Sequence, residues 1–418
     1  MSACREVSVT VPSTAAASQR VQRTYLPERA EQIGTSVRAA DRSLNLDGGG
    51  HGLLDTTHFD TVRFPPPDWA GPAFAAAAAD GALAYTPYRG HPGVLDHLAG
   101  TLGPILGIPL SGTSNLALTP GTQAALFATL AALVDAEDLV VVADPDYLFN
   151  ERILAFLGAR VRRVGIVRDQ SGDHLDLDAL ERACAERPRL LLFSNPSNPL
   201  GVVHSEQTLD RIAELAEQWD FRVVVDSLYC RLVYDDTPFR HLAALPGMAE
   251  RCVTLLGPSK TESMSGYRIG VTCGPPDVLD AIESVLSATS LRAPAYAQQL
   301  LRHWWVDDVD FVAARVTELR VIQDVTLEYL RRVPYLKVRP AQATAYLFPD
   351  VSALGLADHA VAARLQQEAG VIVSPGYQFG PGGVGHFRTC YARNESEWYE
   401  ALDSVVAVLL AVGKEQRV

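Results

Sequence analysis

Lysine is almost missing from this chain of 418 residues: lysine and arginine together number 36, but only Lys260, Lys337 and Lys414 are lysines. A chain that avoids lysine so thoroughly, yet places one just after an apolar run, is expected to need amine chemistry there. A guanidinium cannot provide that chemistry, because arginine stays protonated and forms no Schiff base. The alternative is that Lys260 is an ordinary surface residue of a loop.

Cysteine forms no recognisable pattern either. The six cysteines are scattered, with no C-x-x-C pair and no histidine nearby at the spacing of a zinc site. We therefore expect no metal, and we interpret the cysteines as reduced thiols of a cytoplasmic protein. The N-terminus also lacks the apolar stretch of a secretory signal.

Positive charge is in deficit over the whole chain, and the formal net charge is −13. Nucleic acids and anionic membranes are bound by clustered positive charge, so neither is expected as a partner. The most apolar segment, from Ala124 to Val142, is interrupted by Asp135, Glu137 and Asp138, which predicts a helix followed by a strand and not a membrane span. A small-molecule ligand is favoured.

The length of the chain exceeds that of a single core, so two domains are expected. From Leu116 to Leu256, apolar strand-like runs alternate with helical stretches, which predicts an α/β fold with a mainly parallel sheet covered on both faces. Residues 1–43 suit an N-terminal arm. Residues 44–309 form the predicted large domain, and residues 310–418 a smaller α+β domain.

Polar side chains follow three of the predicted strands. Asn198 comes after one apolar run, Asp226 and Tyr229 after the next, and Lys260 after a third. Ligands bind at the carboxyl ends of parallel strands, so these four side chains are expected at one rim of the sheet.

A second feature, Pro120-Gly121-Thr122-Gln123, reads as a tight turn between a strand and a helix. Free N–H groups at Gly121, Thr122 and Gln123, together with the helix dipole, predict an anion site. The lysine of a nucleoside-triphosphate loop is missing there, so the expected anion is another phosphate.

An acid, a phenol, an amide and a lysine beside a phosphate-binding turn are what a pyridoxal phosphate site requires. Lys260 would hold the aldehyde as an imine, and Asp226 would keep the pyridine nitrogen protonated. Tyr229 and Asn198 would hydrogen-bond the phenolate oxygen of the ring. The predicted phosphate ligands are the side chains of Ser259 and Arg268 and the N–H groups of the turn.

With these motifs the chain resembles the class I/II aminotransferase family of fold type I pyridoxal phosphate enzymes, over residues 44–410. The motifs are Tyr85 with Gly90-x-Pro92, Pro120-Gly121-Thr122, Asp144-Pro145-x-Tyr147, Asn195-Pro196-x-Asn198-Pro199-x-Gly201, Asp226-x-x-Tyr229, Ser259-Lys260 with Arg268-x-Gly270, Ser374-Pro375-Gly376-x-x-Phe379-Gly380, and Arg388. Each motif alone is weak, but their combination in the family's order is specific.

The resemblance implies a fold and further roles. Tyr147 resembles the aromatic residue that stacks on the cofactor ring, and Arg388 the residue that binds the substrate carboxylate. Tyr85 resembles the tyrosine that reaches the phosphate of the neighbouring subunit, which implies a homodimer with shared sites. The implied large domain has a seven-stranded type of sheet, mostly parallel, between helices, and the first part of the chain to about residue 65 would join the small domain.

Some residues depart from the family's pattern. Gly257 and Leu200 stand where relatives usually have hydroxyl side chains. Gly49, in a run of three glycines, is expected to let the substrate approach the backbone closely; the alternative is that the run is a plain flexible loop. Three neighbouring acids could select a substrate with a cationic side chain such as a guanidinium. The alternative is that they are ordinary solvated acids of a loop. The three acids are Asp47, Asp55 and Asp60.

The reaction itself is left open by the sequence. An ordinary transamination of a free amino acid, through a carbanion at its α-carbon, is the first prediction. An elimination and cyclisation of a hydroxylated arginine in antibiotic biosynthesis, as in the capreomycidine-synthase branch, is the alternative. A more remote alternative is a regulatory protein that has the same fold but no catalytic activity.

Overall fold

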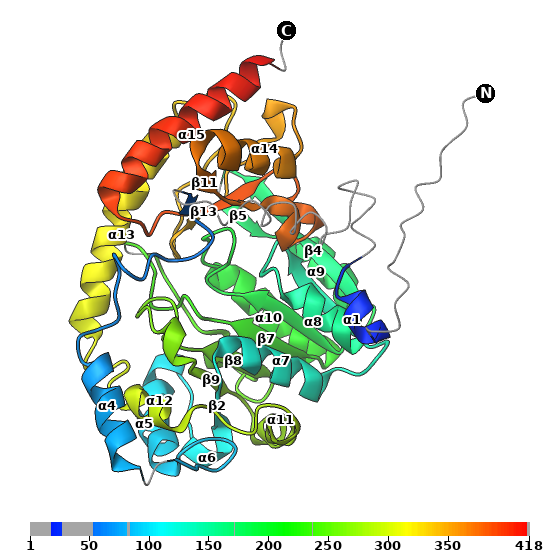
Figure 1. Ribbon diagram of the computed structural model, residues 1–418. Coiled ribbons are helices and arrows are strands. Elements are labelled where there is room, and N and C mark those ends of the chain that lie inside the picture. Colours follow the sequence, from blue (N-terminus) through cyan, green and yellow to red (C-terminus); the bar gives the residue numbers. More distant parts are fainter. Residues whose placement is uncertain (1–17, 27–52, 82–83, 171, 236, 416–418) are drawn as a thin grey trace.

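A computed structural model describes residues 18–26, 53–81, 84–170, 172–235 and 237–415 (Figure 1). Its largest sheet has eight strands in the order β2-β9-β8-β7-β6-β3-β4-β5. The five strands from β8 to β4 are parallel to one another, whereas β9 is antiparallel to both of its neighbours and β5 is antiparallel to β4. The predicted α/β fold with a mostly parallel sheet is confirmed. The sheet has eight strands and not the seven that the resemblance implied, because β5 adds an antiparallel edge strand beside β4.

Six of these strands were expected from apolar runs, but β5 and β9 were not. β5 contains an aspartate and a histidine, and β9 directly follows a glycine- and serine-rich loop, so neither has a long apolar pattern. The strands are β2 (Leu116–Thr119), β3 (Leu139–Asp144), β4 (Arg160–Asp169), β5 (Gly172–Leu175), β6 (Leu190–Ser194), β7 (Arg222–Asp226), β8 (Cys252–Leu256) and β9 (Gly270–Cys273).

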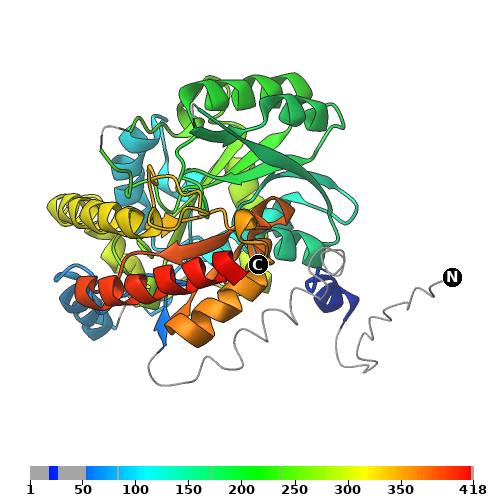
Figure 2. The same ribbon diagram turned by 90° about the horizontal axis from the view of Figure 1, so that it is seen from above.

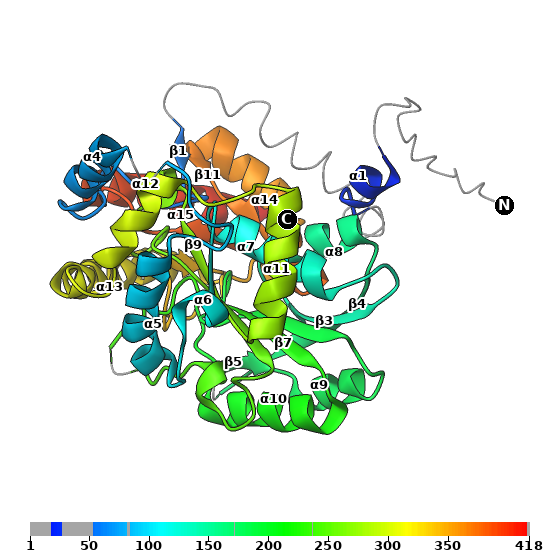
Figure 3. The same ribbon diagram turned by 90° about the horizontal axis from the view of Figure 1, so that it is seen from below.

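Helices cover both faces of the sheet, as Figure 3 shows. Alternate residues of a strand point to opposite faces: Val141 packs in one core and Val142 in the other. The first face is covered by α9 (Leu177–Cys184) and α10 (Glu206–Trp219). The other face is covered by α7 (Thr122–Leu133), α8 (Asn150–Leu157) and α11 (Pro276–Ala288).

A separate core joins the C-terminal part of the chain to a short N-terminal segment. Its long helices α13 (Val309–Leu330) and α15 (Glu395–Glu415) lie side by side (Figure 2). Phe59 and Phe64 are buried in this same core, far in sequence from its other members. α13 begins where the boundary between the domains was placed, and the division itself stays a prediction.

Short strands bring the N-terminal segment and the C-terminal part together. β1 (Leu54–Asp55) pairs in parallel with β11 (Val371–Ile372). A three-stranded antiparallel sheet has β13 (Phe387–Cys390) between β10 (Tyr346–Leu347) and β12 (Ser374–Pro375). The helix α14 (Asp358–Arg364) contacts β12.

Three further helices lie at the end of the molecule away from the C-terminus (Figure 1). α4 (Ala70–Asp80), α5 (Pro92–Leu106) and α12 (Ala295–Gln298) pack together beside β2, over a core of their own. Near the N-terminus, α1 (Gln19–Arg23) contacts α8. No helix in the described ranges is both long enough and apolar enough to cross a membrane.

Candidate active site

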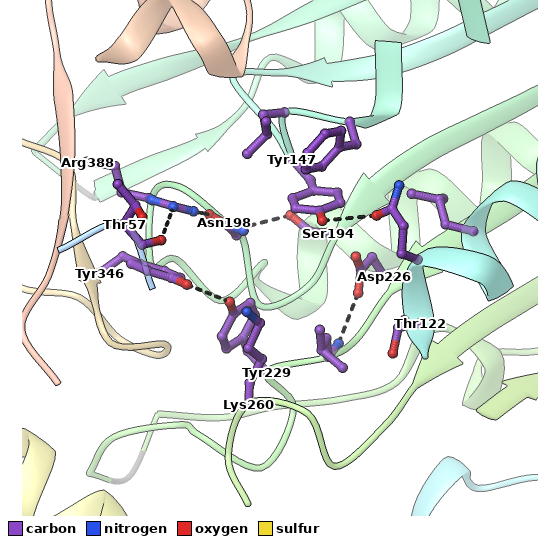
Figure 4. Close-up of a pocket in the computed structure, with 15 residues that line it drawn as sticks. Thr57, Thr122, Tyr147, Ser194, Asn198, Asp226, Tyr229, Lys260, Tyr346 and Arg388 are labelled. Atoms are coloured by element: carbon purple, nitrogen blue, oxygen red, sulfur yellow. Dashed lines mark hydrogen bonds between the residues drawn. The ribbon is translucent and has the colours of Figure 1, made fainter. Parts of the chain in front are cut away.

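The carboxyl ends of β6, β7 and β8 open into a cavity of about 200 Å³. The cavity lies between the large sheet and the small three-stranded sheet, because β10 and β13 also contribute side chains. Figure 4 shows Arg388 and Thr57 at one end, and Asp226 and Thr122 at the other. The lining residues are Thr57, Thr122, Gln123, Leu126, Tyr147, Leu148, Phe149, Ser194, Asn198, Asp226, Leu228, Tyr229, Lys260, Tyr346 and Arg388.

Eight of the residues that the sequence analysis selected line this cavity. Gly121, Ser259 and Arg268 do not line it, but they are close to Thr122 and Lys260 in the chain or in space. The eight residues that line it are Thr122, Gln123, Tyr147, Asn198, Asp226, Tyr229, Lys260 and Arg388.

Asp226 ends β7, and its carboxylate accepts a hydrogen bond from the N–H of Leu228 at 3.1 Å. Burial raises the pKa of Asp226 to about 6, although that hydrogen bond and the charge of Lys260 act in the opposite direction. No ion pair joins Asp226 to any residue that the structure describes. A partly buried carboxylate of this kind, which lines a cavity, fits a cationic ring nitrogen, which would restore its charged form.

The turn before α7 is shaped to bind an anion. Gly121 has φ of +80°, and a Cβ there would overlap the guanidinium of Arg268. The guanidinium donates to the carbonyl oxygens of Ser265 at 3.0 Å and Pro120 at 3.3 Å. Ser259 has a buried hydroxyl without a hydrogen-bond partner. A phosphate placed here would supply that hydroxyl with an acceptor.

One detail of the predicted anion site is corrected by the structure. The N–H of Gly121 is not free, because it donates to the carbonyl oxygen of Thr119 at 2.7 Å.

The departure from the family's pattern at Gly257 has a steric reason: a Cβ there would lie 2.9 Å from Oγ1 of Thr122. Glycine therefore lets the loop after β8 pack directly against the turn that begins α7.

Arg388 is 4% exposed and lies on β13. Its guanidinium donates to Oδ1 of Asn198 and to the carbonyl oxygen of Thr57, both at 2.8 Å. Its Nε has no partner, and no carboxylate of the described chain forms an ion pair with it. A buried cation that lacks a counter-ion and lines a cavity fits a carboxylate ligand.

The loop that carries Lys260 is held by buried ionic contacts. Arg231 bridges Glu262 and Asp308, and all three side chains are at most 6% exposed. Arg315 of α13 donates to the carbonyl oxygen of Thr261 at 3.1 Å. Since Asp308 immediately precedes α13, these contacts tie the Lys260 loop to the first helix of the smaller core.

Four polar residues at the cavity or next to it were missed by the sequence analysis. Thr57 and Tyr346 come from segments without a polar strand end to mark them. Ser194 does end a strand, and its hydroxyl accepts the N–H of Asn198 at 3.0 Å. Asp146 accepts hydrogen bonds from Ser194, and burial raises the pKa of Asp146 to about 7.

Two of the predicted acids of the N-terminal segment, Asp55 and Asp60, do not line the cavity. Oδ1 of Asp55 accepts the N–H of Thr57 at 2.8 Å, and Oδ1 of Asp60 accepts the N–H of Val62 at 2.9 Å. Both carboxylates therefore stabilise local turns, and their position does not favour the predicted contact with a substrate side chain. Two further predicted residues, Asp47 and Gly49, lie outside the described residues.

Residues 55–405 match the family model described as aminotransferase class I and II. The chain belongs to this family. It is 30% identical, over 389 residues, to the probable aspartate/prephenate aminotransferase of Thermus aquaticus, which covers 92% of the chain and 99% of that relative. It is also 30% identical, over 270 residues, to the arginine–pyruvate transaminase of Pseudomonas aeruginosa, covering 64% and 68%.

The solved structure of an aspartate aminotransferase from Rhodobacter sphaeroides has a TM-score of 0.83 and 34% identity, and it covers 90% of this chain and 99% of its own. Members of the class I and II aminotransferase family depend on pyridoxal phosphate, so the protein is a pyridoxal phosphate enzyme that acts on amino acids. These comparisons do not favour the capreomycidine-synthase branch.

Proposed function

We propose that the enzyme transfers the amino group of a free α-amino acid to a 2-oxo acid, with pyridoxal phosphate in the cavity between the two sheets. The observation that carries the proposal is the cavity itself. It brings one lysine, one partly buried carboxylate and one buried arginine together, and Lys260 is the only amine among its described lining residues. When bound, pyridoxal phosphate acts as an electron sink for the α-carbon of the substrate.

Each residue of the cavity then has a distinct task. Lys260 would hold the cofactor through its amine, and that amine would accept the α-proton of the substrate and return a proton later. Asp226 would pair with the ring nitrogen and keep it cationic. Tyr147 would pack on the ring, and Tyr229 and Asn198 would hydrogen-bond its phenolate oxygen. The N–H groups of Thr122 and Gln123 and the side chains of Ser259 and Arg268, beside Gly121, would hold the phosphate.

The test of the reaction is its stoichiometry without an added 2-oxo acid. A transaminase should release about one 2-oxo acid per active site and then stop, because the amino group stays on the enzyme. Addition of a 2-oxo acid should restart turnover. Repeated turnover of 3-hydroxyarginine to a cyclic product without any 2-oxo acid would instead support the cyclisation alternative.

Arg388 is proposed to bind the substrate carboxylate with two parallel hydrogen bonds. Arg388→Lys should raise KM for amino acids by about 10–100-fold, because an ammonium cannot donate the two parallel hydrogen bonds that a planar guanidinium gives to a carboxylate. Steady-state kinetics would measure this change. Arg393 is a matched control, since it is 3% exposed, donates to the carbonyl oxygen of His58 and does not line the cavity. Equal effects of Arg393→Lys and Arg388→Lys on KM would contradict the assignment.

A homodimer with shared sites is part of the proposal. Tyr85 is 84% exposed, although it is a large aromatic side chain, and the guanidinium of Arg292 lies 5.3 Å from its ring centroid. Such a residue suits an interface, where it would reach the phosphate site of the neighbouring subunit.

The scattered cysteines, five of which are free in the described chain, support a reducing compartment such as the cytoplasm.

A hybrid dimer tests the shared site. Tyr85→Ala and Lys260→Ala subunits, co-expressed with different tags, should form hybrids in which one site has both Lys260 and Tyr85. With random pairing, about a quarter of the wild-type activity should return. If Tyr85 served the site of its own subunit, no hybrid would recover activity.

A further inference from the structure

Tyr346 lies between the substrate end of the cavity and the phenol of Tyr229, and the sequence analysis had not selected it. It begins β10, which pairs with the strand that carries Arg388. The side chain is 1% exposed yet lines the cavity. Its position therefore allows contact with both the substrate-binding residue and a residue at the cofactor (Figure 4).

The ring of Tyr346 supports the guanidinium of Arg388. The Cζ atom of Arg388 lies 4.1 Å from the centroid of this ring, and 4.8 Å from that of Phe379. A cation over an aromatic face is attracted to it, and more so where water is excluded. The two rings therefore help to hold the guanidinium in the plane in which it can bind a carboxylate.

The hydroxyl of Tyr346 accepts a hydrogen bond from the hydroxyl of Tyr229 at 3.1 Å. Two phenols have two hydroxyl hydrogens, and this contact uses one of them. In this arrangement the hydroxyl hydrogen of Tyr346 is the one that is free. For Tyr229 to donate to a cofactor in the cavity that it lines, the contact has to reverse: the hydroxyl of Tyr346 then donates to that of Tyr229, and the hydrogen of Tyr229 points into the cavity. A hydroxyl that accepts a hydrogen bond also donates more strongly, because chains of hydrogen bonds polarise one another.

The pair is also sensitive to charge at Arg388. Burial raises the pKa of Tyr229 well above its usual value, Tyr346 raises it further, and the cation of Arg388 lowers it. A substrate carboxylate bound to Arg388 would offset that cation and weaken the remaining O–H as a donor. The other titratable groups around the pair are Cys390 of β13, Asp226 of β7, Tyr147 and Lys260.

We propose that Tyr346 is a positioning residue that couples the carboxylate site at Arg388 to the hydrogen bond which Tyr229 supplies to the cofactor. The inference rests on the proposed function, because it requires pyridoxal phosphate near Tyr229. It adds a second route between the two ends of the cavity, beside the direct hydrogen bond from Arg388 to Asn198. Its ring acts on substrate binding, and its hydroxyl acts on the cofactor.

Two substitutions separate the two parts of Tyr346. Tyr346→Phe removes only the hydroxyl, so the donor to the phenolate oxygen of the cofactor weakens. The apparent pKa of the visible absorbance of bound pyridoxal phosphate should then rise by about 0.5–1 unit, with KM changed less than about 2-fold. Tyr346→Leu also removes the ring under Arg388 and should raise KM by about 3–30-fold.

A carboxylic acid without an amino group, such as 4-methylpentanoate, tests the coupling. It should bind at Arg388 and shift the absorbance pKa of the wild-type holoenzyme. The shift should be smaller in Tyr346→Phe, because only the route through Asn198 remains. An equal shift in both proteins would overturn the coupling.

Tyr391→Phe is the matched control for loss of a buried hydroxyl. The hydroxyl of Tyr391 donates to that of Tyr234 at 2.8 Å in the same core, and neither residue lines the cavity. This control should leave the absorbance pKa unchanged. If Tyr391→Phe and Tyr346→Phe shift it equally, or if neither shifts it, Tyr346 has only a structural role. If the wild-type protein shows no bound pyridoxal phosphate, the proposed function fails before this inference is tested.

Discussion

Lys260→Ala should retain the fold and bind pyridoxal phosphate without a covalent bond, with turnover of amino acids reduced by on the order of 10⁴-fold or more. The cavity contains no other described amine, histidine or cysteine that could accept the α-proton in its place. Borohydride treatment of the wild-type holoenzyme, followed by peptide mapping, should find the pyridoxyl group on the peptide that contains Lys260.

The near absence of lysine makes the control for this experiment simple. Lys337 and Lys414 are the other two lysines, and both are exposed. Replacing both by alanine should leave the activity and the visible absorbance of the holoenzyme unchanged. Labelling on either of these residues, or near-normal turnover of Lys260→Ala, would exclude the proposed role of Lys260.

Asp226→Asn should have two effects of opposite sign: a loss of turnover by orders of magnitude, and a more stable cofactor-free protein above pH 6. An amide cannot pair with a cationic ring nitrogen, so the electron sink weakens. Burial raises the pKa of Asp226 from 3.8 to about 6, so the folded protein holds this proton more tightly than the unfolded chain. Stability is therefore lost as the pH rises through this window, and the asparagine variant avoids that loss.

The expected gain in the free energy of unfolding is near zero below about pH 3, about 0.5 kcal/mol at pH 4 and about 2–3 kcal/mol above pH 6. Urea unfolding of the cofactor-free protein at several pH values would measure it. The gain should disappear in the holoenzyme, where the ring nitrogen pairs with Asp226. Equal stability of the wild type and the variant at pH 8 would contradict a desolvated carboxylate without an ion-pair partner at this position.

Asp220 is the control with the opposite sign. It is exposed, and its hydrogen bond with Arg251 lowers its pKa. Its φ of +51° is well tolerated by asparagine, so Asp220→Asn keeps the backbone. This variant should lose stability, not gain it, at neutral pH, and its turnover should match that of the wild type.

Much of the cofactor side of the cavity followed from local sequence. Buried parallel strands are apolar along their whole length, so a polar residue directly after such a strand marks the rim of the sheet. Asp226 ends such a strand and Lys260 lies in the loop after one, and the structure brings both to one cavity. The scarcity of lysine left three candidates, and the apolar run before Lys260 distinguished it from Lys337 and Lys414.

The substrate side depended on contacts between distant segments. Tyr346 meets Tyr229 because β10 pairs with β13, and no local pattern encodes that pairing. Asp55 and Asp60 looked like substrate residues, but an aspartate can hydrogen-bond the backbone two residues ahead, and here both do so.

The sequence by itself therefore determined the family, the cofactor and the residues at the ends of the buried strands, because these depend on hydrophobic pattern and on motif order. Only the tertiary structure decided that Arg388 stays buried without a counter-ion, and that Tyr346 joins it to Tyr229. The physical reason is that these interactions form between the two sheets. Which side chains meet there is set by strand pairing and packing over hundreds of residues of chain.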